Sequence, residues 1–138
     1  GRIPLKPGYE SETCTGKPAA PPMGEFQASD GGYGYVTFNP LTTLLMCCDH
    51  AALFRFTPRE PLLTDVDITW LVRDDAEPGR DYDPENVLWF WDVTTKQDAK
   101  ITEDNQAGIL STRYRPGPYS EIEATTDRIL RWYLRRIA

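Results

Sequence analysis

The stretch Asn86–Val87–Leu88–Trp89–Phe90–Trp91–Asp92–Val93–Thr94–Thr95–Lys96–Gln97–Asp98 decides the fold, and the pattern that it starts continues through Gln106. Its beginning has the residues of a helix start. Asp83 can cap the helix, Pro84 suits the first helical position, and Glu85 lies in the first turn. We therefore predict one long amphipathic helix over residues 84–106.

The predicted helix has an apolar-rich side and a charged side when it is projected at about 100° per residue. The apolar-rich side holds Val87, Phe90, Trp91, Thr94, Ile101, Thr102 and Asn105. The charged side holds Glu85, Asp92, Lys96, Lys100, Glu103 and Asp104. Asp98 is the exception, because it falls in the middle of the apolar-rich side.

A carboxylate on a buried face costs free energy unless it is paired, hydrogen-bonded or bound to a metal. Asp98 is therefore open to two interpretations. It is either a buried acid satisfied by an arginine or by backbone amides, or a metal ligand or catalytic acid that faces a pocket. The helical pattern alone does not decide between them.

Composition limits the classes of protein to which the chain can belong. Its 138 residues suffice for one domain with a core, and 26% charged with 40% hydrophobic residues is typical of globular proteins. Fifteen basic and 21 acidic side chains give a net charge of −6, which argues against nucleic acid and anionic membranes as partners. No apolar run approaches the ~18 residues of a membrane span, and no signal-peptide pattern opens the chain, so we expect a soluble, cytoplasmic protein.

The cysteines and the single histidine suggest no metal site of their own. Three cysteines, two of them adjacent, suit neither a disulfide framework nor a zinc site. We expect Cys47 and Cys48 to be small apolar residues on a strand. The segment 47–50 ends in Asp49 and His50, but side chains that alternate on a strand and then enter a turn are poorly arranged to hold a metal.

The rest of the chain predicts an irregular start, a group of strands and a second helix. Residues 1–32 are rich in proline and glycine, and this lead-in packs over another part of the protein, belongs to a larger body from which it enters, or is a flexible terminus. Residues 33–73 then predict four antiparallel strands, at 33–39, 42–48, 52–57 and 64–73.

Two further patterns complete the prediction of an α+β fold. In the fourth strand, Asp65 and Asp67 alternate with apolar residues, so we expect both carboxylates to face solvent. Ser120 and Glu123 form a capping box at the start of a helix over 120–138. The predicted fold is thus an antiparallel sheet of about four strands followed by two helices.

The motifs of the long helix resemble a known family. They are Phe90–Trp91–Asp92, Gln97–Asp98, Glu103, Asn105–Gln106, Gly108–Ile109 and, after the helix, Pro116–Gly117–Pro118–Tyr119–Ser120. Together they resemble the C-terminal half of the catalytic domain of Rieske-type non-haem iron oxygenases. These are the large subunits of ring-hydroxylating dioxygenases and of related demethylating monooxygenases. The resemblance is densest over residues 83–133.

The resemblance implies a fold and a set of site residues. In this family two histidines and one carboxylate hold a mononuclear iron, and Asp98 followed by Glu103 fits the carboxylate motif. Asp98 is then the metal ligand, and no residue of this chain is assigned a catalytic or cofactor-binding role. The residues expected to line the substrate pocket or to hydrogen-bond around the metal are Trp91, Val87, Thr94, Ile101, Thr102 and Asn105. Residues 33–138 would form the C-terminal half of a helix-grip (START-like) domain.

The resemblance also implies partners that this sequence does not contain. The family's Rieske domain with its [2Fe-2S] cluster and the helix bearing the two iron histidines belong to an N-terminal part of the same subunit. A homotrimer, a reductase or ferredoxin electron donor, a small organic substrate and O2 are implied as well. The isolated chain should neither hold Fe(II) tightly nor hydroxylate or demethylate a substrate, and its open sheet should favour self-association.

Two other functions remain as alternatives. One is a non-catalytic helix-grip module that holds an apolar ligand in its cavity. The other is a purely structural fragment. Asp98 separates these from the oxygenase, because an apolar carrier has no use for a carboxylate in its cavity wall.

Overall fold

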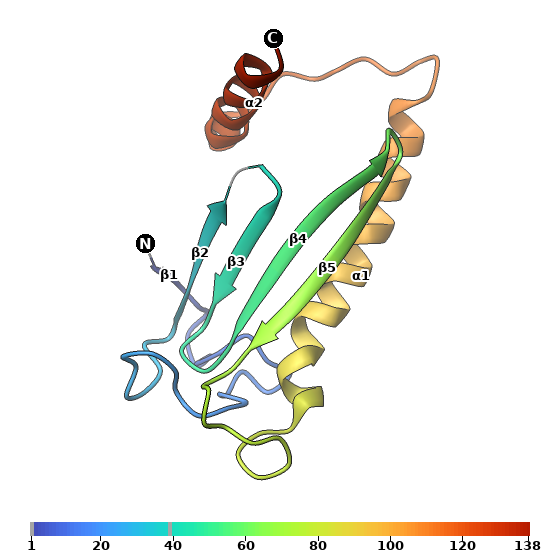
Figure 1. The fold of residues 1–138 in the computed structure, drawn as a ribbon. Helices are drawn as coiled ribbons and strands as arrows, with labels where there is room; N and C mark the ends of the chain where they lie inside the picture. The colour runs from blue at the N-terminus through green and yellow to red at the C-terminus, as the bar shows by residue number, and fades with distance from the viewer. Residues whose placement is uncertain (1, 39) are drawn as a thin grey trace. The chain divides into compact units, whose positions relative to one another are not determined.

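The computed structural model describes residues 2–38 and 40–138. Its elements in chain order are β1 (Arg2–Pro4), β2 (Gly32–Phe38), β3 (Thr42–Met46), β4 (Ala51–Glu60), β5 (Leu63–Leu71), α1 (Pro84–Ile109), the short 3-10 helix η1 (Glu121–Glu123) and α2 (Ala124–Ile137) (Figure 1). The chain divides into two compact units, Gly1–Thr94 and Thr95–Ala138, and the helix α1 passes from the first into the second.

The strands form one antiparallel sheet in the order β1-β2-β3-β4-β5, so each strand pairs with its neighbour in sequence. This confirms the predicted α+β class and the antiparallel meander. The strand β1 was not predicted, because three residues between prolines and glycines carry no alternation. Arg2 stabilises β1 by donating hydrogen bonds to Asp30 Oδ2 (2.8 Å) and to the carbonyl oxygen of Met46 (2.8 Å).

Three predicted strand ends were wrong by two or more residues, and one of them is the end of the strand predicted over 64–73, because β5 stops at Leu71. The last residue of the strand predicted over 33–39 lies outside the described residues. The strand predicted over 52–57 continues through Pro58 to Glu60. Proline is tolerated there because β3 pairs with β4 only as far as Arg55, and a register shift follows between Pro58 and Glu60. The strand predicted over 42–48 ends at Met46, because the amide of Cys47 bonds to the carbonyl oxygen of His50 (2.9 Å) and closes a turn.

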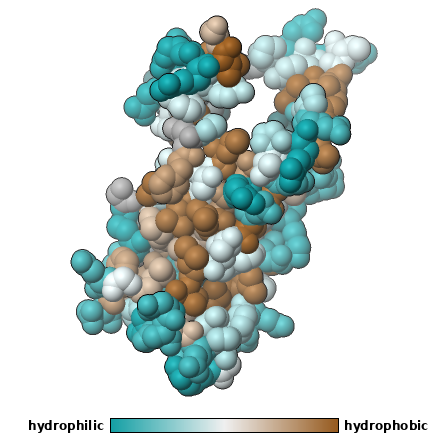
Figure 2. All heavy atoms as spheres, viewed as in Figure 1, coloured by the Kyte–Doolittle hydropathy of each residue, from teal (hydrophilic) through white to brown (hydrophobic). Residues whose placement is uncertain are grey.

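The two faces of the β4–β5 hairpin differ in charge. Its register places Ala52, Phe54 and Phe56 opposite Trp70, Ile68 and Val66, all on one face. The other face carries the exposed ion pairs Arg55–Asp67 (2.9 Å) and Arg59–Asp65 (2.6 Å), as expected for outward-facing Asp65 and Asp67. Hydrophobic side chains also gather over the middle of the sheet (Figure 2).

The core of the unit Gly1–Thr94 is partly apolar and partly polar. Its apolar part joins the sheet to the first turns of α1, where Val87 is buried and the ring of Phe54 packs on that of Trp91. Its polar part lies where the lead-in covers the β3–β4 turn, and there Ser11, Asp49 and His50 are fully buried. Among the interpretations of the lead-in, the structure supports packing over another part of the protein.

The unit Thr95–Ala138 contains the C-terminal half of α1, a connecting segment and α2. The helix predicted over 84–106 extends to Ile109, and the helix predicted over 120–138 begins as η1 and continues as α2. The predicted capping box is confirmed: the amide of Ser120 donates to Glu123 Oε2 (2.7 Å). Among the described residues, no helix combines the length and the apolar composition that crossing a membrane requires.

Candidate functional site

Asp98 lies in the C-terminal half of α1, within the unit Thr95–Ala138. Its side chain is exposed, whereas the helical pattern led us to expect a buried face. Its face neighbour Ile101 is 66% exposed, so this part of α1 leaves even its apolar side chains open. No hydrogen bond or ion pair engages the Asp98 carboxylate among the described residues, so neither an arginine nor a backbone amide satisfies it. Its role as a metal ligand stays a prediction.

The other predicted pocket residues fall into two groups along α1. Val87, Trp91 and Thr94 belong to the unit Gly1–Thr94, where Val87 is buried and the other two are half-buried. The Thr94 hydroxyl donates to the carbonyl oxygen of Phe90 (2.8 Å), so it is engaged within the helix. The second group, Ile101, Thr102 and Asn105, is exposed.

Aromatic rings meet where α1 packs on the sheet. The rings of Phe54 and Trp91 lie 5.7 Å apart at 80°, and those of Phe90 and Trp91 lie 5.0 Å apart at 89°. Trp70 is on the same face of the sheet as Phe54, since it pairs with Ala52. Its Nε1–H is buried and has no hydrogen-bond partner among the described residues. Trp70 is one of the apolar residues that alternate with the aspartates of the fourth predicted strand, and that alternation gave no reason to single out this donor.

A second cluster of functional groups surrounds Asp49, and sequence analysis missed it. The carboxylate accepts hydrogen bonds from Ser11 Oγ (2.5 Å) and from the amide of Ala19 (2.7 Å), and it lies 3.1 Å from His50 Nδ1. Burial opposes ionisation of this group, but His50 and the two donors outweigh burial and lower the pKa of Asp49 to about 2. Asp49 is therefore a buried anion that holds the lead-in on the β3–β4 turn.

Glu12 and Cys47 extend this polar cluster. The Cys47 thiol donates to Glu12 Oε2 (3.6 Å). Burial raises the pKa of the Glu12 carboxyl, and it raises the pKa of the Cys47 thiol to about 12. Cys47 is thus a thiol rather than a nucleophilic thiolate. Within residues 2–38 and 40–138, no group of three or more His, Cys, Asp or Glu side chains is arranged to hold a metal ion.

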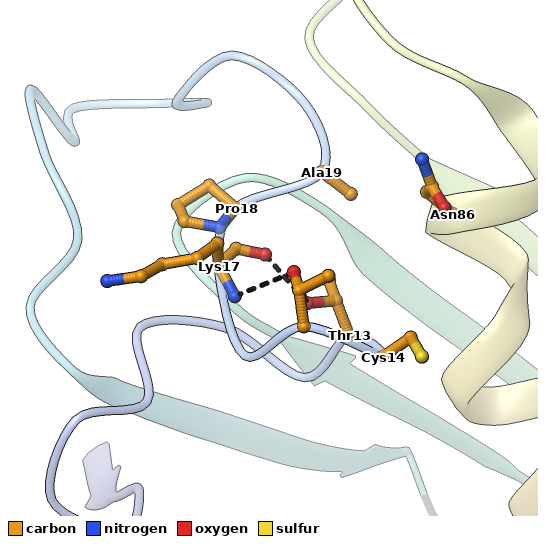
Figure 3. Close-up of a pocket in the computed structure, with 7 residues that line it drawn as sticks. Thr13, Cys14, Lys17, Pro18, Ala19 and Asn86 are labelled. Carbon is orange, nitrogen blue, oxygen red and sulfur yellow. Dashed lines mark hydrogen bonds between the residues drawn. The ribbon is translucent and has the colours of Figure 1, made fainter.

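A small pocket lies between the lead-in and the start of α1 (Figure 3). It has a volume of about 70 Å³ and is lined by Thr13, Cys14, Thr15, Lys17, Pro18, Ala19 and Asn86. Thr13 Oγ1 donates to the carbonyl oxygen of Lys17 (2.7 Å), which fixes the loop that forms one wall. The pocket has room for a few water molecules, and the Lys17 side chain points away from Asn86 (Figure 3). It is too small for an organic substrate.

Comparison with known proteins gives the family. The family model described as ring hydroxylating alpha subunit (catalytic domain) matches residues 2–138. The chain belongs to this family of oxygenase alpha subunits. The resemblance drawn from the motifs of α1 is thereby confirmed, and so is the helix-grip type of catalytic domain that it implied.

Three relatives within this alpha-subunit family carry the name glycine betaine monooxygenase oxygenase subunit. The protein from Chromohalobacter salexigens is 42% identical over 120 residues, which cover 86% of this chain and 27% of the relative. Proteins from two strains of Pseudomonas aeruginosa are 36% identical over 138 residues, which cover 99% of this chain and 32% of each relative. The chain therefore spans about a third or less of the length of these alpha subunits.

Proposed function

We propose that this chain is the part of a Rieske-type non-haem iron oxygenase that supplies Asp98, the carboxylate ligand of the mononuclear iron, and one wall of the substrate pocket. The observation that carries the proposal is the family match over residues 2–138, in combination with an unpaired carboxylate at the motif position on α1. The relatives' name supports oxygenase chemistry on a small organic substrate.

The donor atoms of the chain suit one position of such an iron site. A carboxylate oxygen is the one anionic ligand of a two-histidine, one-carboxylate centre, and Asp98 is exposed and has no competing partner among the described residues. The single histidine, His50, is fully buried beside Asp49. Both imidazole ligands must then come from outside this sequence, so the chain would contribute one ligand of three.

Ferrous iron would supply the reductive activation of O2, with electrons from a [2Fe-2S] Rieske cluster that a reductase or ferredoxin reduces. The residues of this chain would bind and position. Asp98 would offset part of the charge of the metal, and Asn105, about 10 Å further along the same side of α1, would offer an amide to the groups around the metal. Trp91 and Val87 would form an apolar pocket wall that excludes water, with Thr94, Ile101 and Thr102 along the same side of α1.

The arrangement of the whole enzyme is part of the same proposal. A homotrimer would allow the Rieske cluster of one subunit to serve the iron of its neighbour. The reaction would be the O2-dependent hydroxylation of a substrate, or its demethylation where the hydroxylated carbon is an N-methyl group. Turnover would require the complete subunit, since this chain holds too few ligands.

The test is the substitution Asp98→Ala in the full-length subunit, with Asp98→Asn as the isosteric variant. Both should lower the iron content measured by elemental analysis at least tenfold, and turnover should be lost, while the circular dichroism spectrum is unchanged. Asp104→Ala is the matched control, because Asp104 is on the same helix but is paired with Lys100. An iron-replete, active Asp98→Ala subunit would contradict the assignment.

The isolated 138-residue chain gives a second test of the ligand set. Elemental analysis of the chain purified in the presence of Fe(II) should find no retained iron, because one carboxylate cannot hold the ion alone. Iron at one equivalent per chain would show that this sequence contains the whole site.

A further inference from the structure

We infer that the face of the sheet opposite α1 is a docking surface for the part of the same subunit that lies outside this chain. The surface is the outer apolar patch, a set of side chains on β2, β3, β4 and β5: Val36, Phe38, Leu44, Met46, Leu53 and Leu71. All of them lie within the unit Gly1–Thr94. The inference rests on the family membership of the chain and not on the role of Asp98.

The register of the strands defines this face. The ring of Phe54 packs on that of Trp91 in α1, so the face that carries Phe54 is the inner one. Leu53 precedes Phe54 on β4 and therefore points to the outer face. Leu53 is aligned with Leu44 on β3, and Leu44 is aligned with Val36 on β2. These three aliphatic side chains form one continuous row across the outer face.

The outer face changes in polarity along the sheet. Where one face of an antiparallel sheet is in water, the outward positions are normally polar. The β4–β5 hairpin follows this rule, because Arg55 and Asp67 take its outward positions. Along β2 and β3 the outward positions carry Val36 and Leu44, whereas Thr37 faces inward. This reversal indicates that the outer apolar patch is made for a contact and the hairpin for solvent.

The outer apolar patch is open in the structure. The exposed fractions are 42% for Val36, 56% for Phe38 and 39% for Leu71. Leu44 and Leu53 between them are half-buried. A contiguous apolar surface of this kind commonly marks a site of protein contact.

The size and the charge of the patch favour the rest of the subunit as its occupant. A specific interface between separate proteins takes about 800 Å² from each partner, which is more than a few partly exposed side chains supply. The charges that border the patch, Arg55 and Asp67, pair with each other at 2.9 Å, so they do not select a charged partner. About two-thirds or more of each matched relative lies outside the region that this chain covers. A segment of the same polypeptide is tethered nearby, so it can cover a small neutral surface.

The experiment uses the photoreactive substitution Phe38→benzoylphenylalanine in the full-length subunit, because it keeps an aromatic ring at a position that is 56% exposed here. After irradiation, we expect the subunit to keep its own mass on a denaturing gel. Peptide mapping by mass spectrometry should join position 38 to a peptide outside the 138 residues. Asp67→benzoylphenylalanine is the matched control, because Asp67 is on the same face and its side chain is 54% exposed. It should not join that peptide.

Four results would overturn the inference. A cross-linked species of twice the subunit mass would show that a second copy covers the patch. A cross-link only to residues of this chain would show that the chain covers the patch itself. No cross-link would leave the patch facing water in the whole subunit. The same cross-link from position 67 would show that the contact is not specific to the patch.

Thiol labelling gives a second measurement that does not depend on the variant at position 38. In the full-length subunit with Cys14→Ser, which removes an exposed thiol, Val36→Cys should react with a maleimide about tenfold more slowly than Asp67→Cys. The rates are followed at the modified peptides. Equal rates would contradict the inference. Iron content is measured in the same samples, so a failure of the Asp98 assignment is seen separately.

Discussion

Asp49 and Asp67 are two carboxylates of the same unit in opposite environments. Asp49 is fully buried in the β3–β4 turn and contacts the Ser11 hydroxyl, the Ala19 amide and His50. Asp67 lies on the outer face of β5, its side chain is 54% exposed, and it contacts one arginine, Arg55, at 2.9 Å. Both carboxylates have close partners.

The difference between them shows what burial does to the same chemical group. The surface pair is screened by water and holds two flexible side chains, so it contributes little to stability. The buried anion has given up its hydration, and each of its partners would be left unsatisfied without it. Asp49 therefore determines where the lead-in packs, whereas Asp67 mainly keeps the outer face of the hairpin polar.

The largest expected effect comes from Asp49→Ala. It should lower the free energy of unfolding by about 3 kcal/mol or more, because it leaves the Ser11 hydroxyl and the Ala19 amide without their acceptor and removes the carboxylate beside His50. Urea unfolding measures the loss, and chymotryptic cleavage after Tyr9 should become faster as the lead-in loosens. Asp74→Ala, in an exposed loop, is the control. A loss below 1 kcal/mol would remove the distinction between the two carboxylates.

A smaller effect is expected when acid neutralises Asp49. Its pKa is about 2 in the folded chain against 3.8 for the unperturbed group, so ionised Asp49 contributes about 2 kcal/mol of stability above pH 4. Because the folded pKa is the lower one, this contribution is lost as the pH falls from about 4 to about 2. Urea unfolding at a series of pH values should show this slope in the parent and a reduced slope in Asp49→Asn. If the free energy of unfolding of the parent and of Asp49→Asn depended equally on pH, the assignment of this pH dependence to Asp49 would be contradicted.

The smallest effect is expected at the surface. Asp67→Ala should lower the free energy of unfolding by less than 1 kcal/mol, and the difference from the parent should shrink in 1 M salt, because the Arg55–Asp67 pair is exposed. The same urea titration measures it. A loss comparable to that of Asp49→Ala would mean that this pair is not screened as its exposure implies.

Most of the fold could be predicted from hydrophobic periodicity. The alternation in residues 33–39 and 64–73 and the helical pattern from Pro84 onward predicted β2, β5 and α1, with the described ends within a few residues. The capping box at Ser120 gave the start of the last helix. These signals are local, since each depends on residues that are close in the sequence.

The features that depend on contacts between distant residues could not be predicted. The strand β1 depends on the hydrogen bonds from Arg2 to Asp30 and Met46. The strand β4 tolerates Pro58 because β3 does not pair with β4 beyond Arg55. Cys47 and Cys48 are buried, but they lie in a turn and not on the strand that we predicted, and that turn, with the role of Asp49 in it, depends on Ser11 and Ala19. The one sequence signal for this buried cluster was a single aspartate, Asp49, next to small residues that are buried.

The candidate site also contains features that local sequence predicts and features that depend on contacts between distant residues. Asp98 was found from its position on one helix and from the motif around it, both of which are local in sequence. The meeting of Trp91 with Phe54, and the unsatisfied donor of Trp70 on the same face, required the register of β4 and β5. Helical periodicity gave Trp91 an inward direction but could not name its partners.

The short pairing of β3 with β4, which stops at the Thr42–Arg55 pair, has a mechanical consequence. Beyond Arg55 the sheet is reduced to the β4–β5 ribbon, whose tip carries Leu62 and Leu63, 66% and 52% exposed. Two-stranded ribbons twist more strongly than wider sheets and open more easily. We therefore expect the β4–β5 ribbon to be more flexible beyond Arg55 than the wider part of the sheet. The hairpin tip can bend near Arg55 while the wider part of the sheet keeps its shape.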